Sequence, residues 1–271
     1  MRRLVVVGRG KVGRALAAAA RARGLRVVSY AARALPESIR ASDLVVLASR
    51  DADLPRLAPL LAAALRAPSA VVHCSGALSA EILAPLRAAG HAVGVMHPLA
   101  SFASPLEPPA LVGAALVLSG DLPARRMARR LGRKLGMRCF EPVHLDPAAY
   151  HAAAALVANG AASLAAAAGA LLSHAGFDPS VHGKLLGPLL RSVGENVARL
   201  GPRAALSGPV RRGDLATIER HLEIAARVAS PQIDLPSLYR ALARAQVPLA
   251  ERIGEAPPAS LAQIRALVKE P

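Results

Sequence analysis

Residues 4–13, LVVVGRGKVG, constrain the fold of this chain more than any other stretch. Four apolar residues indicate a short buried strand, the run GRGKVG follows at once, and an Ala-rich stretch at 14–23 predicts a helix. In this order, strand then G-x-G-x-x-G then helix, the pattern predicts a dinucleotide site. The alternative is a Gly-rich turn without a ligand.

Each part of this loop has an expected role. Gly8 would permit the tight turn, Gly10 would leave space for a diphosphate, and Gly13 would let helix and strand pack closely. The N–H groups that begin the helix would face the phosphates. The predicted phosphate-binding residues are Gly8, Arg9, Gly10, Lys11, Val12 and Gly13.

The second predicted strand, residues 25–30, bears on which dinucleotide is bound. In NAD-binding domains an acidic residue at the end of this strand holds the ribose 2′-hydroxyl. Here Ser29 and Tyr30 occupy that place, and the next charged residue is Arg33. An Arg there favours a 2′-phosphate, so we expect NADP(H) as the cofactor. The alternative is a solvent-facing loop Arg, since Arg is common in this chain.

Strands and helices alternate over the first half of the chain, whereas the second half predicts helices alone. Apolar runs predict further strands at 43–48, 70–73, 92–96 and 111–118, with helices at 54–65, 79–89 and 122–135. Later helices are expected at 147–175, 179–200, 214–229, 235–246 and 259–269. The predicted class is therefore α/β, with a doubly wound, mostly parallel sheet over residues 1–143 and an all-helical domain over 144–271.

Composition limits the partners of the chain. The formal net charge of +16 suits nucleic acid, but the Arg residues are dispersed and only 2% of residues are aromatic, so we do not expect nucleic-acid binding. Cys74 and Cys139 have no metal-ligand spacing and form no disulfide framework, which favours a reducing cytoplasm and no metal site.

Residues 152–172 form a segment that is long enough and uncharged enough to span a membrane, yet most of its residues are Ala. A buried helix at a domain or subunit interface is the better interpretation.

Polar residues that could carry chemistry follow two predicted strands. His73, Cys74 and Ser75 end one strand, and His97 follows the next, where ligands of parallel sheets bind. We also expect the end of the third strand, Ala48, Ser49, Arg50 and Asp51, to lie beside the cofactor. His73 is as well explained as a core histidine whose ring is satisfied by backbone groups.

A third polar group lies in the helical half. Tyr150 and His151 begin the long Ala-rich helix, and Asn159 lies two turns on, where a buried amide would need partners. Further along, one face of a predicted helix carries Asp214, Thr217 and His221, which follow two adjacent Arg residues in the sequence. An N-cap role for Asp214 and a solvent-facing position for His221 are equally acceptable. The candidate substrate-binding residues here are Arg211, Arg212, Asp214 and His221.

Taken together, several motifs carry a family resemblance. The sequence, with GRGKVGRAL, DLVVLASRDADL, VVHCSGALSAEIL, GVMHPLASF, AYHAAAALVANG and SGPVRRGDLATIERHL, resembles bacterial oxidoreductases that pair a Rossmann-like NADP-binding domain with a C-terminal helical domain known as DUF2520. The family is related to pyrroline-5-carboxylate reductases and to β-hydroxyacid and prephenate dehydrogenases. The resemblance implies a homodimer through the helical domain, and some relatives are proposed to be ketopantoate reductases.

The resemblance also suggests site roles. His97 would be the acid/base and Ser75 would orient it, as the similar pair does in prephenate dehydrogenases; Asn159 matches the Asn of β-hydroxyacid dehydrogenases, whose Lys has no counterpart here. We therefore expect hydride transfer between NADP(H) and a small polar carbonyl, imine or hydroxy acid. His151 and Asn159 would bind the substrate, and Arg211 or an adjacent Arg would hold a substrate carboxylate. The alternatives are a non-catalytic NADP(H) sensor and a prephenate-type oxidative decarboxylation.

Overall fold

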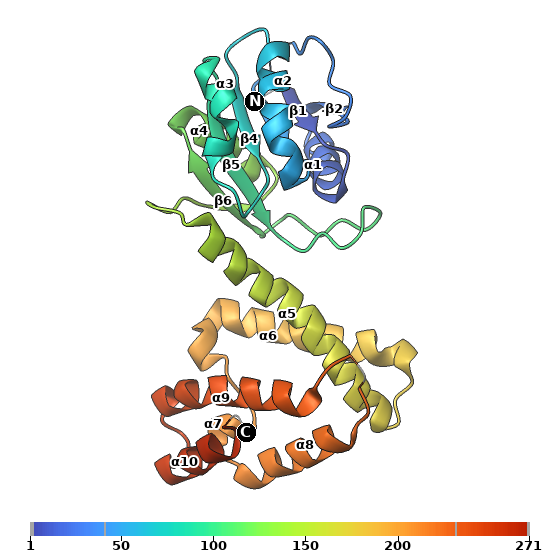
Figure 1. The fold of residues 1–271 in the computed structure, drawn as a ribbon, viewed down its shortest axis with the longest axis vertical. Helices are drawn as coiled ribbons and strands as arrows, with labels where there is room; N and C mark the ends of the chain where they lie inside the picture. The colour runs from blue at the N-terminus through green and yellow to red at the C-terminus, as the bar shows by residue number, and fades with distance from the viewer. Residues whose placement is uncertain (1–2, 41, 231, 270–271) are drawn as a thin grey trace. The chain divides into compact units, whose positions relative to one another are not determined.

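The computed structural model describes residues 3–40, 42–230 and 232–269. The chain divides into two compact units, one up to Leu156 and one from Val157 (Figure 1). The division falls inside a helix, downstream of the boundary expected at residues 143/144. The two units are described separately below.

The first unit is built on one seven-stranded sheet in the order β2-β1-β3-β4-β5-β6-β7. Neighbouring strands are parallel except β5 and β6, so the predicted mostly parallel, doubly wound sheet is confirmed. The strands are β1 (Arg3–Val7), β2 (Arg26–Tyr30), β3 (Leu44–Leu47), β4 (Ala70–His73), β5 (Ala92–Leu99), β6 (Ala115–Gly120) and β7 (Arg138–Phe140).

Helices cover both faces of this sheet, as Figure 1 shows. Successive residues of a strand point to opposite faces, and β1 therefore supplies Leu4 and Val6 to one core and Val5 and Val7 to the other. α1 (Lys11–Ala22) and α4 (Leu122–Lys134) pack on the first core, while α2 (Leu54–Ala64) and α3 (Ala84–Ala88) pack on the second. Short 3-10 turns, η1 (Asp51–Asp53) and η2 (Ala80–Leu83), precede α2 and α3.

The strand β5 differs from its prediction in a way that moves a site residue. It was expected to end at Met96, but it continues through Leu99 because it pairs antiparallel with β6. Its ladder with β4 stops at Val95, so Pro98, which has no N–H to donate, lies beyond that pairing. His97 consequently lies within a strand and does not follow one. The three-residue strand β7 was not predicted.

The second unit is helical throughout its described residues, which confirms the predicted class. Its two cores lie among α8, α9 and α10 and between the end of α5 and α8–α9. The helices are α5 (Pro147–His174), which begins in the first unit, η3 (Pro179–Val181), α6 (His182–Ala204), α7 (Pro209–Arg212), α8 (Leu215–Arg227), α9 (Leu235–Ile253) and α10 (Pro258–Leu267).

The long helix α5 is largely uncovered in the single chain. Within the described residues it is the one helix that length and composition would allow to cross a membrane, and 11% of its most apolar window is buried. Leu156 and Val157 are 78% and 74% exposed. The expectation that residues 152–172 are buried therefore does not hold for one chain alone.

The three glycines of the loop should respond differently to substitution by Ala. A Cβ on Gly8, whose φ is +118°, would lie 2.2 Å from the Ala48 carbonyl oxygen, and one on Gly13 would lie 2.1 Å from the Gly8 carbonyl oxygen. A Cβ on Gly10 meets nothing within 4 Å. Gly8→Ala and Gly13→Ala should each lower the free energy of unfolding by about 1–3 kcal/mol or more. Gly10→Ala should cost about 1 kcal/mol or less, through the helix cap.

Denaturant unfolding of the nucleotide-free protein measures these differences. An equal loss in all three variants would contradict the assignment of close backbone contacts to two of the glycines.

Candidate functional site

The glycine loop presents an uncapped helix N-terminus. α1 begins at Lys11, and its N-cap residue is Gly10. Because Gly10 has no side chain, no capping hydrogen bond occupies the first N–H groups of the helix. The first turn of α1 contains no acidic residue. The Arg9 guanidinium donates to the Ser29 carbonyl (3.0 Å) and Arg14 donates to the Arg9 carbonyl (2.9 Å), which holds the loop against β2. Free amides, a positive dipole end and open space beside Gly10 fit a diphosphate.

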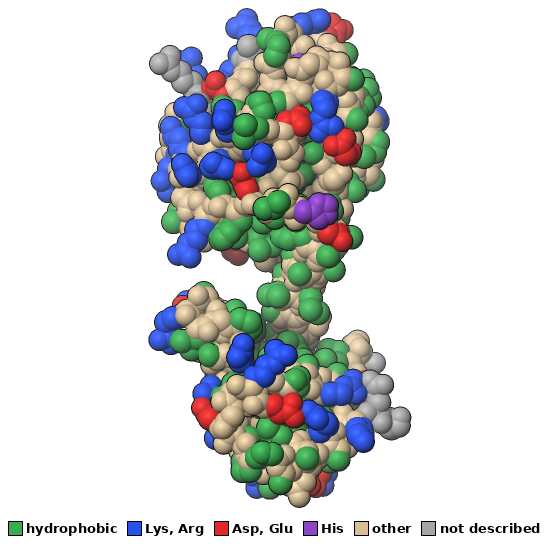
Figure 2. Space-filling view, turned by 90° about the vertical axis from the view of Figure 1, so that its left-hand side faces the viewer, with side chains coloured by type: hydrophobic (Ala, Val, Ile, Leu, Met, Phe, Trp, Pro, Cys, Tyr) green, Lys and Arg blue, Asp and Glu red, His purple; other side chains and the backbone are tan. Residues whose placement is uncertain are grey.

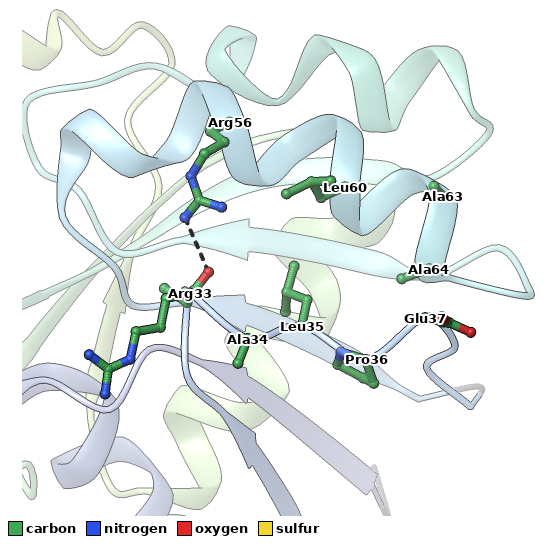
Figure 3. Close-up of a pocket in the computed structure, with 10 residues that line it drawn as sticks. Arg33, Ala34, Leu35, Pro36, Glu37, Arg56, Leu60, Ala63 and Ala64 are labelled. Carbon is green, nitrogen blue, oxygen red and sulfur yellow. Dashed lines mark hydrogen bonds between the residues drawn. The ribbon is translucent and has the colours of Figure 1, made fainter.

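Arg33 lies in a turn directly after β2. The turn is closed by the Ala34 N–H, which donates to the Ala31 carbonyl (3.0 Å), and the exposed Arg33 side chain extends from it (Figure 3). Arg56 reaches from α2 and donates to the Ala32 carbonyl (3.2 Å). Arg33 and Arg56 both line a pocket of about 430 Å³ beneath this turn. Glu37 also lines this pocket, but no acidic residue ends β2. The guanidinium groups of Arg33 and Arg56 near the end of this strand fit a phosphate better than a ribose hydroxyl.

Most of the predicted site residues of the first unit meet in one neighbouring pocket of about 510 Å³. It lies at the carboxyl ends of the parallel strands, and Ala32 borders both pockets. The predicted residues that line it are Gly8, Arg9, Gly10, Lys11, Val12, Ala48, Ser49, Ser75, His97 and His151. The glycine loop and the candidate catalytic groups therefore share a single cavity.

His73 has a structural role, the alternative that the sequence left open. Its Nε2 bonds the Ser79 carbonyl (3.0 Å), and its Nδ1 accepts the Ser75 N–H (3.2 Å). Burial lowers its pKa, and the two partners together fix a neutral ring with the proton on Nε2. The ring therefore shapes the loop after β4 and does not reach the pocket.

Ser75 bonds a different partner from the one predicted. Its hydroxyl donates to Asp51 Oδ2 (2.8 Å) and accepts the Ala77 N–H (3.2 Å). The expectation that Ser75 orients His97 is corrected here, because Asp51 occupies the hydroxyl. Asp51 begins η1 and lines the same pocket.

His97 is instead oriented by Tyr150. Its Nδ1 lies 2.7 Å from the Tyr150 hydroxyl, and the two rings meet edge to face. Burial, and then the nearby His151, lower the pKa of His97 to about 4, although Asp51 acts in the opposite direction. Burial raises the pKa of Tyr150 to about 12. Both groups are therefore neutral near pH 7.

Gly76 lies close to both histidines of the pocket, and a side chain at this position would collide with their rings. A Cβ on Gly76 would lie 2.9 Å from His97 Nε2 and 3.0 Å from His151 Nδ1. The ring centroids of the two histidines are 6.3 Å apart. Since His97 Nδ1 is occupied by Tyr150, its Nε2 is the atom left to meet a ligand.

Asp51, Gly76 and Tyr150 lie in segments that the sequence placed near the site, but no role was predicted for any of them. Asp51 lies in the segment after β3, Gly76 in the segment after β4, and Tyr150 precedes His151. Their partners lie 24 and 53 residues away in the sequence, which no local pattern reveals. No three His, Cys, Asp or Glu side chains within residues 3–40, 42–230 and 232–269 lie close enough together to hold a metal ion.

In the second unit, two of the predicted site residues, Arg211 and Asp214, have partners that stabilise the fold. Arg211 bonds both oxygens of Glu255 and the carbonyls of Ala204 and Leu206, so its guanidinium is used within the fold. Asp214 is the N-cap of α8 and bonds the amide and hydroxyl of the residue three positions on. This corrects the expectation that Arg211 and Asp214 are free to bind a substrate.

The remaining predicted site residues of the second unit are exposed. His221 bonds the Tyr239 hydroxyl (2.7 Å) on the surface of the unit. Arg212 and Asn159 are exposed, so the expectation that Asn159 is a buried amide does not hold in the single chain.

Two family models match the chain. One, described as a Rossmann-like domain, matches residues 18–98, and the other, a domain of unknown function named DUF2520, matches residues 114–246. Among curated proteins, none matches the sequence.

Solved structures match over most of the chain. A Thermotoga maritima protein is 22% identical, with 92% of this chain and 99% of that chain covered and a TM-score of 0.68. A candidate NADP oxidoreductase of Bacteroides fragilis is 19% identical, with 90% and 97% covered and a TM-score of 0.70. A Streptomyces aurantiacus imine reductase is 17% identical, with 99% and 100% covered and a TM-score of 0.57. At these identities the likeness shows the fold, and the two family models show that the chain carries a Rossmann-like domain and a DUF2520 domain.

Proposed function

We propose that this chain is an NADP-dependent oxidoreductase that transfers a hydride between NADP(H) and a small polar carbonyl, imine or hydroxy acid. The observation that carries the proposal is the single pocket lined by both the glycine loop and His97. The fold shared with an imine reductase and a candidate NADP oxidoreductase supports it. A protein that only sensed the nucleotide would need the loop but not the polar groups opposite it.

The residues of the first unit fit the parts of NADP(H). The free amides at the start of α1 would bind the diphosphate, with Arg9 and Lys11 supplying positive charge. Arg33 would bind the 2′-phosphate, and Arg56 would hold the turn through the Ala32 carbonyl. When bound, the nicotinamide ring supplies or accepts the hydride.

His97 acts in this proposal as a neutral proton donor or acceptor. When the Tyr150 hydroxyl donates to Nδ1, the His97 proton lies on Nε2 and can be donated to a carbonyl oxygen while Nδ1 takes the Tyr150 proton; water then reprotonates the tyrosinate. When Tyr150 accepts from Nδ1, Nε2 is a base that can take the proton of a hydroxyl group, and the imidazolium that forms releases a proton to water. A hydroxyl can do either, so one pair of side chains serves both directions of the reaction.

The substrate would lie in the pocket that His97 and His151 both line. For a substrate carboxylate, Arg212 remains the candidate of the second unit, since Arg211 is already bound to Glu255. Asn159 remains a proposed substrate-binding residue.

We also propose that the protein is a cytoplasmic homodimer that binds neither nucleic acid nor membrane. α6 exposes Leu185, Leu189, Val193 and Val197, each 41–58% exposed and four residues apart on one helical face. Hydrophobic side chains also lie on the surface of α5 (Figure 2). Apolar faces of this extent are unfavourable in water, and a second copy would cover them.

The cofactor preference is tested by Arg33→Ala. Loss of a charged hydrogen bond to the 2′-phosphate should weaken NADPH binding by roughly 10- to 100-fold and leave NADH binding nearly unchanged. The matched control is Arg66→Ala, because the exposed Arg66 bonds the same loop through Glu37 and Ser38 and lines neither pocket. Equal losses for NADPH and NADH, measured by fluorescence titration, would remove Arg33 from this role.

The protonation of His97 can be followed without a substrate. The NMR shifts of its ring protons should titrate with a midpoint near pH 4, below the ordinary value of 6.5. His151→Gln should raise the midpoint, because the neighbouring imidazole disfavours the cation. Asp51→Asn should lower it, because the carboxylate favours the cation. A wild-type midpoint near 6.5 would contradict the neutral His97 of the mechanism.

The proposed dimer is tested by sedimentation equilibrium without detergent. The wild type should have twice the chain mass of 27.9 kDa. Leu189→Glu with Val193→Glu should give monomers, because both side chains are exposed in one chain and their replacement spares its core. Leu106→Glu, at an 84% exposed position of the first unit, is the control and should remain dimeric. A monomeric wild type would exclude the dimer, and a need for detergent would favour membrane association.

A further inference from the structure

Asp51 lines the same pocket as His97. Neither the proposed phosphate contacts nor the hydrogen bond between His97 and Tyr150 gives its carboxylate a role. It is exposed, it lines the pocket, and its Oδ2 is fixed by the Ser75 hydroxyl at 2.8 Å. Its charge also acts on His97 and His73. Within the described ranges, Asp51 makes no ion pair with Lys or Arg, and its Oδ1 has no hydrogen bond.

In the first unit, other carboxylates that form ion pairs or hydrogen bonds stabilise the fold. Glu141 bonds Arg125 and Arg129, and Asp121 bonds Arg87 together with a β5 amide. Asp51 differs from these carboxylates because, within the described residues, it has no cationic partner, although the formal net charge of the chain is +16. A carboxylate of this kind can accept a charge-assisted hydrogen bond from a positively charged ligand.

We propose that Asp51 binds a positively charged nitrogen of the substrate, so that the pocket selects a protonated imine and the ammonium group of its reduced product. This inference rests on the proposed function and narrows its substrate class. The cations that line the same pocket, Arg9, Lys11 and Arg50, are the natural partners of the cofactor phosphates.

A protonated imine also suits the neutral groups around it. Its reduction forms one C–H bond with the hydride, and the π electrons of the C=N bond become the lone pair of the nitrogen, while NADPH is oxidised to NADP⁺. The positive charge of the substrate is thereby neutralised, and no side chain has to give up a proton. The neutral amine then takes a proton from water to become the ammonium form of the product. His97 and Tyr150 then orient the nitrogen through hydrogen bonds.

The test compares a cation with a neutral molecule of the same size on the NADP⁺-loaded protein. Piperidine, which is protonated at pH 7, and tetrahydropyran are titrated by calorimetry. The wild type should bind piperidinium at least ~10-fold more tightly, as expected for a charged hydrogen bond. Asp51→Asn should remove that preference while NADPH affinity and the thermal midpoint stay unchanged. Asp53→Asn, a carboxylate lining the same pocket two residues on, should retain the preference.

Three results would overturn the inference. One is equal or undetectable binding of the two ligands to the wild type. Another is an Asp51→Asn variant that keeps the preference, and the third is an Asp51→Asn variant that loses NADPH affinity instead, which would assign Asp51 to the ribose hydroxyls. Failure of the wild type to bind NADPH at all would instead refute the proposed function itself.

Discussion

The site depends on a close contact of three backbone segments. The Gly8 position lies against the Ala48 carbonyl, and Gly13 lies against the Gly8 carbonyl, so β1, α1 and the end of β3 meet with no space for a Cβ. This contact aims the start of α1 at the carboxyl edge of the sheet. Gly10, by contrast, faces open space. Two glycines therefore serve the packing of the fold, and the third leaves room for a ligand.

Burial and charge then divide the pocket. Burial keeps His97 and Tyr150 neutral, whereas the Asp51 carboxylate is exposed in the same pocket. The hydrogen bond between Tyr150 and His97 leaves Nε2 as the free ring atom, and the absence of a side chain at Gly76 avoids a collision with it. In the proposed function, the phosphates would lie at the basic loop and the reacting group would lie between the neutral ring and the carboxylate.

The sequence predicted what local order determines. Strand, glycine loop and helix are adjacent in the chain, so the first βαβ unit, the sheet class and the shared pocket of Ser75, His97 and His151 could be foreseen. Contacts between residues that are far apart in the sequence could not be predicted in this way. β5 extends past Met96 because β6 pairs with it, Ser75 bonds Asp51 in place of His97, and Arg211 bonds a Glu 44 residues away. Each of these errors comes from a partner that only the folded chain supplies.

A crystal structure of the protein with NADP⁺ tests the central claim most directly, because it locates both ends of the cofactor at once. The account predicts the diphosphate on the amides that begin α1, the 2′-phosphate at Arg33, and the nicotinamide ring in van der Waals contact with the His97 side of the pocket, about 4 Å away. A nicotinamide ring directed away from His97 and Asp51, or a diphosphate bound away from Gly10, would contradict it.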